Sequence, residues 1–167
     1  MADIALIRVD SRLIHGQVVT RWVKQLGAKR VYIIDDELKN DPFLTSVFSM
    51  ATPQGTTLEI ATAEEAGQSF QKDGLGEGVV FVLFKNLEMA RAAYDAGFKF
   101  DRLQVAGLGS GPNKQVVYKT VSLSEADAQN LKEMSDMGCR VYFQSIPDEK
   151  ETPLDGILQK FFPSIAK

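Results

Sequence analysis

The sequence has only one cysteine and only one histidine among its 167 residues. A single cysteine cannot form a disulfide within the chain, so no covalent crosslink is expected to stabilise the fold. We interpret Cys139 as a small apolar residue at the start of a core strand. Because no second histidine or cysteine lies near His15, the usual ligand spacing of a metal site is absent, and no metal is expected.

Long apolar runs and an excess of positive charge are lacking too. No apolar stretch approaches the roughly 20 residues that a membrane-spanning helix needs, and the segment after Met1 does not have the pattern of a secretory signal peptide. The formal net charge at pH 7 is -3, so the chain offers no basic excess to a nucleic-acid backbone. We therefore expect a cytoplasmic protein that neither binds nucleic acid nor inserts into a membrane.

What is present is typical of a globular protein. Hydrophobic residues make up 44% of the sequence and charged residues 25%, which excludes a disordered or low-complexity chain. A chain of this length can bury a sizeable core. Because no linker, internal repeat or segment of biased composition interrupts it, we expect one domain over residues 1–167.

Short apolar runs alternate with segments of helical period. The run Val79–Phe84 is apolar at every position, which requires cover on both faces and favours a parallel sheet between helix layers. The other expected strands are 4–7, 31–34, 58–61, 103–106 and 139–143, and the expected helices are 18–26, 41–50, 62–72, 86–96 and 124–138, with a weaker helical pattern over 152–162. We expect a charged turn at Arg8–Arg12, and a hairpin arm or an edge strand at Val116–Leu123.

Capping residues indicate where three of the expected helices begin. Asp41 is the expected cap of the helix 41–50. Thr62 and Glu65 have the spacing of a capping box, and Ser124 and Asp127 can cap the helix that ends near Gly138.

This alternation predicts an open, doubly wound α/β fold: a mostly parallel sheet with helices on both faces and one antiparallel edge strand or hairpin. In such sheets, ligands bind beyond the carboxyl ends of the strands. The loops that follow these ends are Arg8–Gly16, Asp35–Asp41, Phe84–Asn86 and Ala106–Lys114.

The one histidine lies in the first of these loops. Imidazole suits nucleophilic and proton-transfer chemistry near neutral pH. Arg8 and Arg12 offer planar guanidinium groups that fit phosphate oxygens, and Asp10 can accept a hydrogen bond from one ring nitrogen of His15. Gly16 allows close approach to the amides that open the next helix, where anions bind.

These parts suit a histidine that carries a phosphoryl group. The alternative is an ordinary surface histidine in a loop that its own ion pairs hold together, and residue types alone leave both interpretations open. The same holds for Asp35-Asp36, which can bind a ligand or form a solvated turn that hydrogen-bonds its own backbone.

The segment Arg8–Val18 resembles the signature of the enzyme IIB component of the mannose/fructose/sorbose family of bacterial phosphotransferase systems. Its sequence is R-V-D-S-R-L-I-H-G-Q-V, which matches the family pattern R-[IV]-D-x-R-[LF]-[IV]-H-G-Q without a gap. Residues 119–123 resemble the family's K-[ST]-V-S-[LV], and the likeness extends through Trp22 over nearly the whole chain.

The resemblance implies a phosphocarrier subunit of a sugar uptake system. His15 would accept a phosphoryl group from the phosphohistidine of the IIA component, on the ring nitrogen nearer the backbone. It would pass the group to a sugar that enters through the membrane components IIC and IID, which would place the protein at the inner face of the membrane. Arg12 and Asp10 would steady the phosphate and the imidazole, and this chemistry requires no cofactor. The further phosphate-binding candidates are Arg8, Gly16, Gln17 and Gly107.

One segment departs from the family pattern. The family commonly has N-[VI]-G-G or N-[VI]-G-N after the fifth strand, whereas residues 104–107 of this chain are Q-V-A-G. If this loop approaches the phosphate, its fit differs here, and the glycines of 107–111 either supply amides or serve as turn residues. The departure leaves room for a regulatory or binding module that holds a phosphorylated ligand without transferring it. The intact set of His15, Asp10 and Arg12 favours transfer, because anion binding alone does not need it.

Two expectations concern side chains outside the motif. We interpret Trp22 and the phenylalanines at 81, 84, 161 and 162 as core residues. Arg21, the neighbour of Trp22, should point outward, because successive residues on a helix point about 100° apart. Together with Arg8 and Arg12, it would favour the approach of a phosphorylated partner.

Overall fold

A seven-stranded sheet runs through the centre of the computed structural model, which describes residues 1–167. The strands of the chain are β1 (Asp3–Asp10), β2 (Arg30–Ile34), β3 (Thr57–Ala61), β4 (Val79–Phe84), β5 (Arg102–Gly107), β6 (Gln115–Tyr118), β7 (Val121–Leu123), β8 (Arg140–Phe143) and β9 (Thr152–Pro153). The order in the sheet is β3-β2-β4-β1-β5-β8-β9. All neighbours in it pair in parallel except β9, which is antiparallel to β8 at one edge, while β6 and β7 form a separate antiparallel hairpin. The predicted fold class is confirmed.

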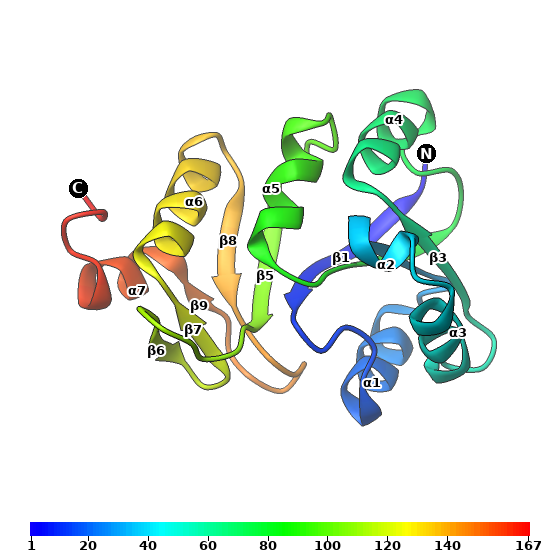
Figure 1. The fold of residues 1–167 in the computed structure, drawn as a ribbon, viewed down its shortest axis with the longest axis horizontal. Helices are drawn as coiled ribbons and strands as arrows, with labels where there is room; N and C mark the ends of the chain where they lie inside the picture. The colour runs from blue at the N-terminus through cyan, green and yellow to red at the C-terminus, as the bar shows by residue number, and fades with distance from the viewer.

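Helices cover both faces of this sheet. They are α1 (Gly16–Leu26), α2 (Asp36–Lys39), α3 (Pro42–Ala51), α4 (Ala63–Asp73), α5 (Leu87–Asp95), α6 (Glu125–Asp136) and α7 (Leu154–Phe161). Helices α1, α2 and α3 contribute to a core cluster on one face, and α4 to α7 to a larger cluster on the other. Figure 1 shows α4, α5 and α6 along one side of the sheet and α1 and α3 along the other. The structure contains no helix that combines the length and the apolar character of a membrane span.

Several helix ends follow from capping residues that the sequence predicts. Thr62 and Glu65 form a reciprocal capping box at the start of α4, and Ser124 and Asp127 form another at the start of α6. Each box pairs amides that the first helical turn would otherwise leave without a partner. Helix α1 ends at Gly27 with φ 66°, a left-handed conformation that glycine adopts without strain.

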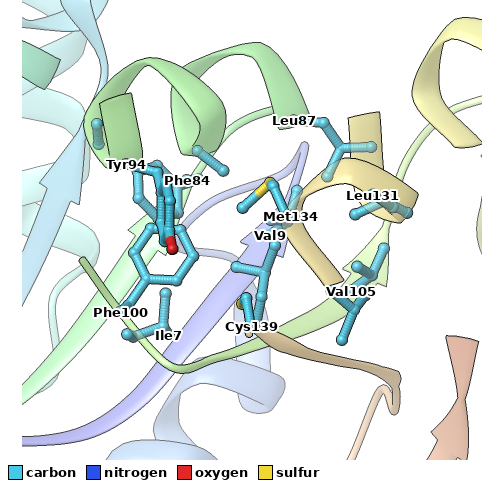
Figure 2. Close-up of a cluster of buried hydrophobic side chains, with 14 of the residues drawn as sticks. Ile7, Val9, Phe84, Leu87, Tyr94, Phe100, Val105, Leu131, Met134 and Cys139 are labelled. Atoms are coloured by element: carbon cyan, nitrogen blue, oxygen red, sulfur yellow. The ribbon is translucent and has the colours of Figure 1, made fainter. Parts of the chain in front are cut away.

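The larger core cluster is built around aromatic rings. The ring of Phe100 packs against both Phe84 and Tyr94, with ring centroids 5.9 Å and 5.2 Å away (Figure 2). Cys139 belongs to the same cluster, and burial raises the pKa of its thiol to about 12. It is therefore the inert, buried residue that the sequence predicts. Trp22 is buried as well. The phenylalanines expected in the core are buried at 81, 84 and 162 and partly buried at 161.

Two local expectations are wrong. The charged turn predicted for Arg8–Arg12 is shorter, because β1 continues to Asp10; Arg8 and Asp10 are both fully buried and neutralise each other inside the sheet. The helix predicted for 152–162 begins only at Leu154, because Thr152–Pro153 pairs with β8 as an edge strand. Proline is tolerated at such an edge, where its missing N–H costs no ladder hydrogen bond.

Candidate functional site

The histidine loop leaves the central strand of the sheet at its carboxyl end. Strand β1 lies between β4 and β5, and the chain turns at Ser11 and Arg12 before α1 begins. Leu13 and Ile14 are 2% and 6% exposed, so the loop is anchored in the core beneath α1. His15, the residue that precedes α1, is thereby held at the carboxyl ends of the parallel strands, with its side chain 23% exposed.

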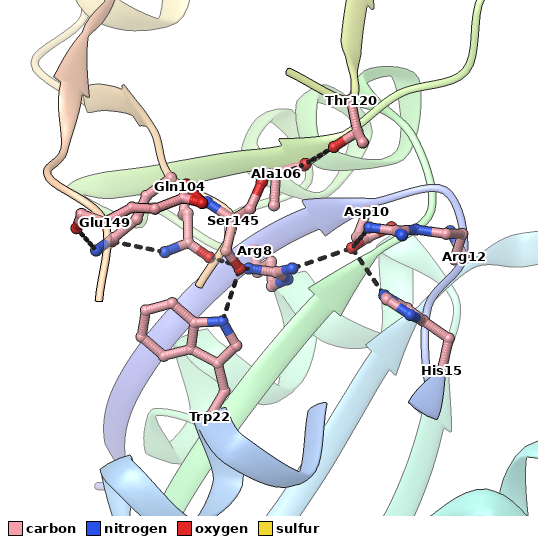
Figure 3. Close-up of polar contacts among 11 residues, drawn as sticks. Arg8, Asp10, Arg12, His15, Trp22, Gln104, Ala106, Thr120, Ser145 and Glu149 are labelled. Carbon is pink, nitrogen blue, oxygen red and sulfur yellow. Dashed lines mark hydrogen bonds and ion pairs between the residues drawn. The ribbon is translucent and has the colours of Figure 1, made fainter. Parts of the chain in front are cut away.

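Asp10 is the centre of the site (Figure 3). Its buried carboxylate accepts hydrogen bonds from Arg8 Nη2 at 3.1 Å and from Arg12 Nε and Nη2 at 3.0 and 3.1 Å. The ring Nε2 of His15 lies 3.2 Å from Oδ2 of the same carboxylate. Because an ionised carboxylate can only accept, Nε2 is the donor and Nδ1 carries the free lone pair. The structure thus brings together the three residues predicted as catalytic.

Two positive charges keep Asp10 ionised. Burial alone would raise the pKa of Asp10, but hydrogen bonds from Arg12 and the charges of Arg8 and Arg12 outweigh burial and hold the pKa below its usual value. Burial lowers the pKa of Arg8, and the nearby Asp10 charge opposes that shift. Since arginine keeps its proton in proteins, Asp10 remains a carboxylate with two cationic partners at neutral pH.

Arg8 contacts Asp10 from the interior of the protein. Its side chain is fully buried, and its Nη1 donates to Oε1 of Gln104 at 2.7 Å and to the Ser145 carbonyl at 2.8 Å. Its guanidinium carbon also lies 5.8 Å from the centre of the Trp22 ring. A side chain with no exposed surface cannot touch a ligand at the sheet edge. We therefore assign Arg8 a positioning role in place of the predicted phosphate contact.

The segment that departs from the family pattern lies inside the protein. Gln104 and Ala106 are both fully buried. Gln104 accepts from Arg8 and donates to Oε1 of Gln144 at 3.0 Å, so its longer side chain helps hold the buried guanidinium. The Ala106 carbonyl accepts from the hydroxyl of Thr120 at 2.9 Å. Neither side chain faces the surface on which a phosphate would bind.

The loop after β8 is part of the site, and sequence reasoning missed it. The Ser145 carbonyl accepts from Arg8 and, at 3.0 Å, from Nε1 of Trp22. The Glu149 carboxylate in turn accepts from the Ser145 amide at 3.1 Å and from the hydroxyl of Tyr118 at 2.7 Å. A signal was available, because this loop also follows the carboxyl end of a parallel strand.

The lack of a side chain at Gly107 leaves room for the Asp10 carboxylate. The two residues face each other across β1 and β5, and the Gly107 carbonyl accepts from the amide of Ser11 at 2.9 Å. A Cβ atom at position 107 would lie 2.7 Å from Oδ1 of Asp10 and 3.3 Å from Nη2 of Arg12. These contacts give Gly107 a steric role, and its predicted phosphate contact stays a prediction.

We expect Gly107→Ala to destabilise the protein and to disturb Asp10. The added methyl group must displace a carboxylate that three side chains hold in place, and overpacking of this kind typically costs about 1–3 kcal/mol. Chemical denaturation measures the loss. Gly109→Ala is the matched control, because a Cβ there would meet nothing within 4 Å. Equal unfolding midpoints for the two variants would contradict the steric role.

Groups on the outer side of His15 remain free to bind an anion. Nη1 of Arg12 forms no hydrogen bond in the structure, and the side chain is 47% exposed. Gly16 and Gln17 are exposed and open helix α1, which has neither a side-chain cap nor an acidic residue in its first turn. The first amides of such a helix lack intrahelical partners and favour negative charge.

Asp35 and Asp36, which follow β2, both accept hydrogen bonds from backbone amides. Asp35 is buried and accepts from the amide of Leu38 at 2.9 Å, while Asp36 accepts from the amide of Ala63 at 2.9 Å. The turn interpretation is therefore correct for the hydrogen bond of Asp35, although Asp35 is buried and not solvated. It is wrong for Asp36, which accepts from an amide at the start of α4 and not from its own turn.

Known proteins resemble the chain over nearly its whole length. The family model described as PTS system sorbose subfamily IIB component matches residues 4–163. The PTS system sorbose-specific EIIB component of Klebsiella pneumoniae is 30% identical over 158 residues, which cover 95% of this chain and 94% of that protein.

Solved structures share the fold. The crystal structure of manxB from Thermoanaerobacter tengcongensis superposes with a TM-score of 0.90 at 35% identity, covering 98% of this chain and 99% of that one. The IIBSor domain of the sorbose permease from Klebsiella pneumoniae gives a TM-score of 0.85 at 27% identity, covering 95% and 98%.

Proposed function

The chain belongs to the sorbose subfamily of phosphotransferase system IIB components, and from this membership we propose that it carries a phosphoryl group on His15 during sugar uptake. Nδ1 of His15 accepts the group from the phosphohistidine of a IIA component. The group then passes to a sugar that enters through the membrane components IIC and IID. In this proposal, residues 1–167 act as one cytoplasmic domain at the inner face of the membrane.

The orientation of the His15 ring is the observation that carries this proposal. With Nε2 bound to Asp10 at 3.2 Å, the lone pair on Nδ1 is available to attack phosphorus. The ring gains positive charge as the new N–P bond forms and the bond to the donor nitrogen breaks. The Asp10 carboxylate lies where it stabilises that charge, and Arg8 and Arg12 keep the carboxylate in place.

The free donors around His15 suit the phosphoryl oxygens. Nη1 of Arg12 and the amides of Gly16 and Gln17 provide hydrogen bonds for their negative charge. Because phosphoryl transfer depends on positioning and on charge stabilisation, the proposal requires no metal or organic cofactor. The alternative, a module that binds a phosphorylated ligand without transfer, has no need of a buried carboxylate that orients an imidazole.

Incubation with phosphoenolpyruvate, enzyme I, HPr and a cognate IIA component tests the proposal. We expect one acid-labile phosphoryl group per chain, which disappears when sugar and membranes that contain IIC and IID are added. A chain that takes up no phosphate, or takes up acid-stable phosphate, would refute the proposal.

Free positive charge near the site is scarcer than the sequence indicates. Arg21 points outward as predicted, but its guanidinium pairs with Asp148, in the loop after β8, at 2.6 Å. Arg8 is buried, so Arg12 is the remaining cation of the motif that can attract a phosphorylated partner.

We expect phosphorylation by IIA to slow as ionic strength rises, because charge at the rim of an interface mainly affects the rate of association. Arg21→Glu places two carboxylates side by side and should slow the reaction roughly threefold to tenfold at low salt. Asp148→Asn frees Arg21 and should speed it. Rates of the wild type and both variants at low and high salt provide the measurement, and salt-independent rates in all three would exclude electrostatic steering.

A further inference from the structure

Helix α3 exposes an apolar face that nothing in the protein covers. Its sequence is P-F-L-T-S-V-F-S-M-A, and none of its residues is buried. Phe43 is 75% exposed, Val47 38% and Met50 80%. Spacings of four and three residues place these side chains along one stripe of the helix. An exposed apolar stripe of this kind marks an interaction surface.

The other side of α3 fixes its orientation. Phe48 packs against the core cluster beneath α1, and the hydroxyl of Thr45 donates to the Leu38 carbonyl at 3.2 Å. Asp41 caps the first turn by accepting from the amide of Leu44 at 3.0 Å. The helix is therefore anchored, and the outward direction of its apolar stripe follows from its packing.

A pocket of about 230 Å³ joins α3 to the histidine loop. Ser11 and Leu13 line it from the loop that holds His15, and Leu44 and Phe48 line it from α3. A partner that docks over this pocket therefore contacts both α3 and the loop that holds His15.

Acidic groups line this pocket beside α3. Glu37 and Asp41 line the pocket, and neither forms an ion pair in the structure. Asp35 adds a third carboxylate, against the single ammonium group of Lys85. Such a rim repels a phosphorylated donor and attracts a basic partner.

We propose that the α3 face, defined as Phe43, Val47 and Met50 with the acidic rim of Glu37 and Asp41, docks on the cytoplasmic loops of the membrane component that receives the phosphoryl group. This inference rests on the proposed function. Cytoplasmic loops of membrane proteins carry an excess of lysine and arginine, which complements the rim. The apolar stripe supplies the desolvated centre that protein interfaces use, with polar groups around it.

Cosedimentation with inside-out membrane vesicles that contain IIC and IID tests the docking directly. Phe43→Ser and Met50→Ser should weaken binding of the unphosphorylated protein by about tenfold or more, because exposed aromatic and long apolar side chains dominate such contacts. Met137→Ser is the matched control, since Met137 is also exposed, at 47%, but follows the far end of α6. Unchanged binding of both α3 variants would overturn the proposal.

Charge reversal tests the rim. Glu37→Lys should weaken vesicle binding and reduce its dependence on salt. Asp3→Lys, which reverses an exposed charge at the opposite end of β1, should leave binding unchanged. Equal effects of the two reversals would show a general response to net charge and would overturn the rim's role.

Separate measurements of phosphate uptake from IIA and of phosphate transfer to sugar distinguish this surface from the one that binds the donor. Phe43→Ser should accept phosphate from IIA at the wild-type rate, yet require about tenfold more protein for half-maximal transfer to sugar, with the same rate at saturation. Equal slowing of both halves would assign α3 to the donor and overturn the proposal.

Two further outcomes would also overturn it. One is Phe43-dependent binding to vesicles of phosphatidylethanolamine and phosphatidylglycerol without protein, and the other is a Phe43-dependent dimer in sedimentation equilibrium. A failure of the proposed function looks different: wild-type protein takes up no phosphate from IIA, whereas cosedimentation of the unphosphorylated chain still reports docking.

Discussion

We expect His15→Ala to abolish phosphate incorporation from phosphoenolpyruvate, enzyme I, HPr and IIA. His15 is the only imidazole in the chain, so no second histidine can replace it. The fold should survive, because the side chain is partly exposed and its one polar contact is with Asp10. Incorporation of labelled phosphate, followed together with thermal unfolding, measures both effects.

Thr20→Ala serves as the matched control for this experiment. Thr20 is exposed on α1, the helix that follows His15, and its loss should change neither incorporation nor unfolding. Labelled phosphate on a folded His15→Ala chain would show that another residue carries the phosphoryl group. This result would refute the assignment of His15 as the phosphorylated residue.

The fold is predictable where apolar patterning dominates. The run Val79–Phe84 predicts a strand that is covered on both faces, and it forms β4 between β2 and β1. Thr62 and Ser124 predict helix starts because their capping chemistry is local. The end of β1 cannot be predicted from local pattern, because charged residues near that end are buried. Charged residues indicate exposure unless a partner is known, and the pairing of Arg8 with Asp10 becomes visible only in the structure.

The site likewise has a part that local sequence predicts and a part that depends on distant contacts. His15, Asp10 and Arg12 lie within one short segment, so their proximity follows from the sequence. Ser145 is 137 residues from Arg8 along the chain, and no spacing rule connects two such positions. Which face of α3 stays uncovered likewise depends on tertiary packing, although Asp41 predicts where the helix begins.

We expect Arg12→Ala to slow phosphorylation of His15 by roughly a hundredfold or more. Removing a donor that offsets charge in the transition state costs about 3 kcal/mol, which corresponds to this factor. Arg8 cannot compensate, because it is fully buried behind Asp10. Single-turnover transfer from phosphorylated IIA measures the rate. Lys24→Ala, which removes an exposed cation from α1, controls for net charge.

Arg12→Lys should restore only part of the rate. The guanidinium holds Asp10 through Nε and Nη2, and its Nη1 forms no hydrogen bond in the structure. In the proposed mechanism, one side chain therefore both orients the carboxylate and receives the incoming charge. The single ammonium of lysine lacks this planar fork and cannot reproduce both contacts with the same geometry. Full recovery in Arg12→Lys would show that positive charge alone is sufficient. Near-normal transfer in Arg12→Ala would instead assign charge stabilisation to the amides of Gly16 and Gln17 at the start of α1.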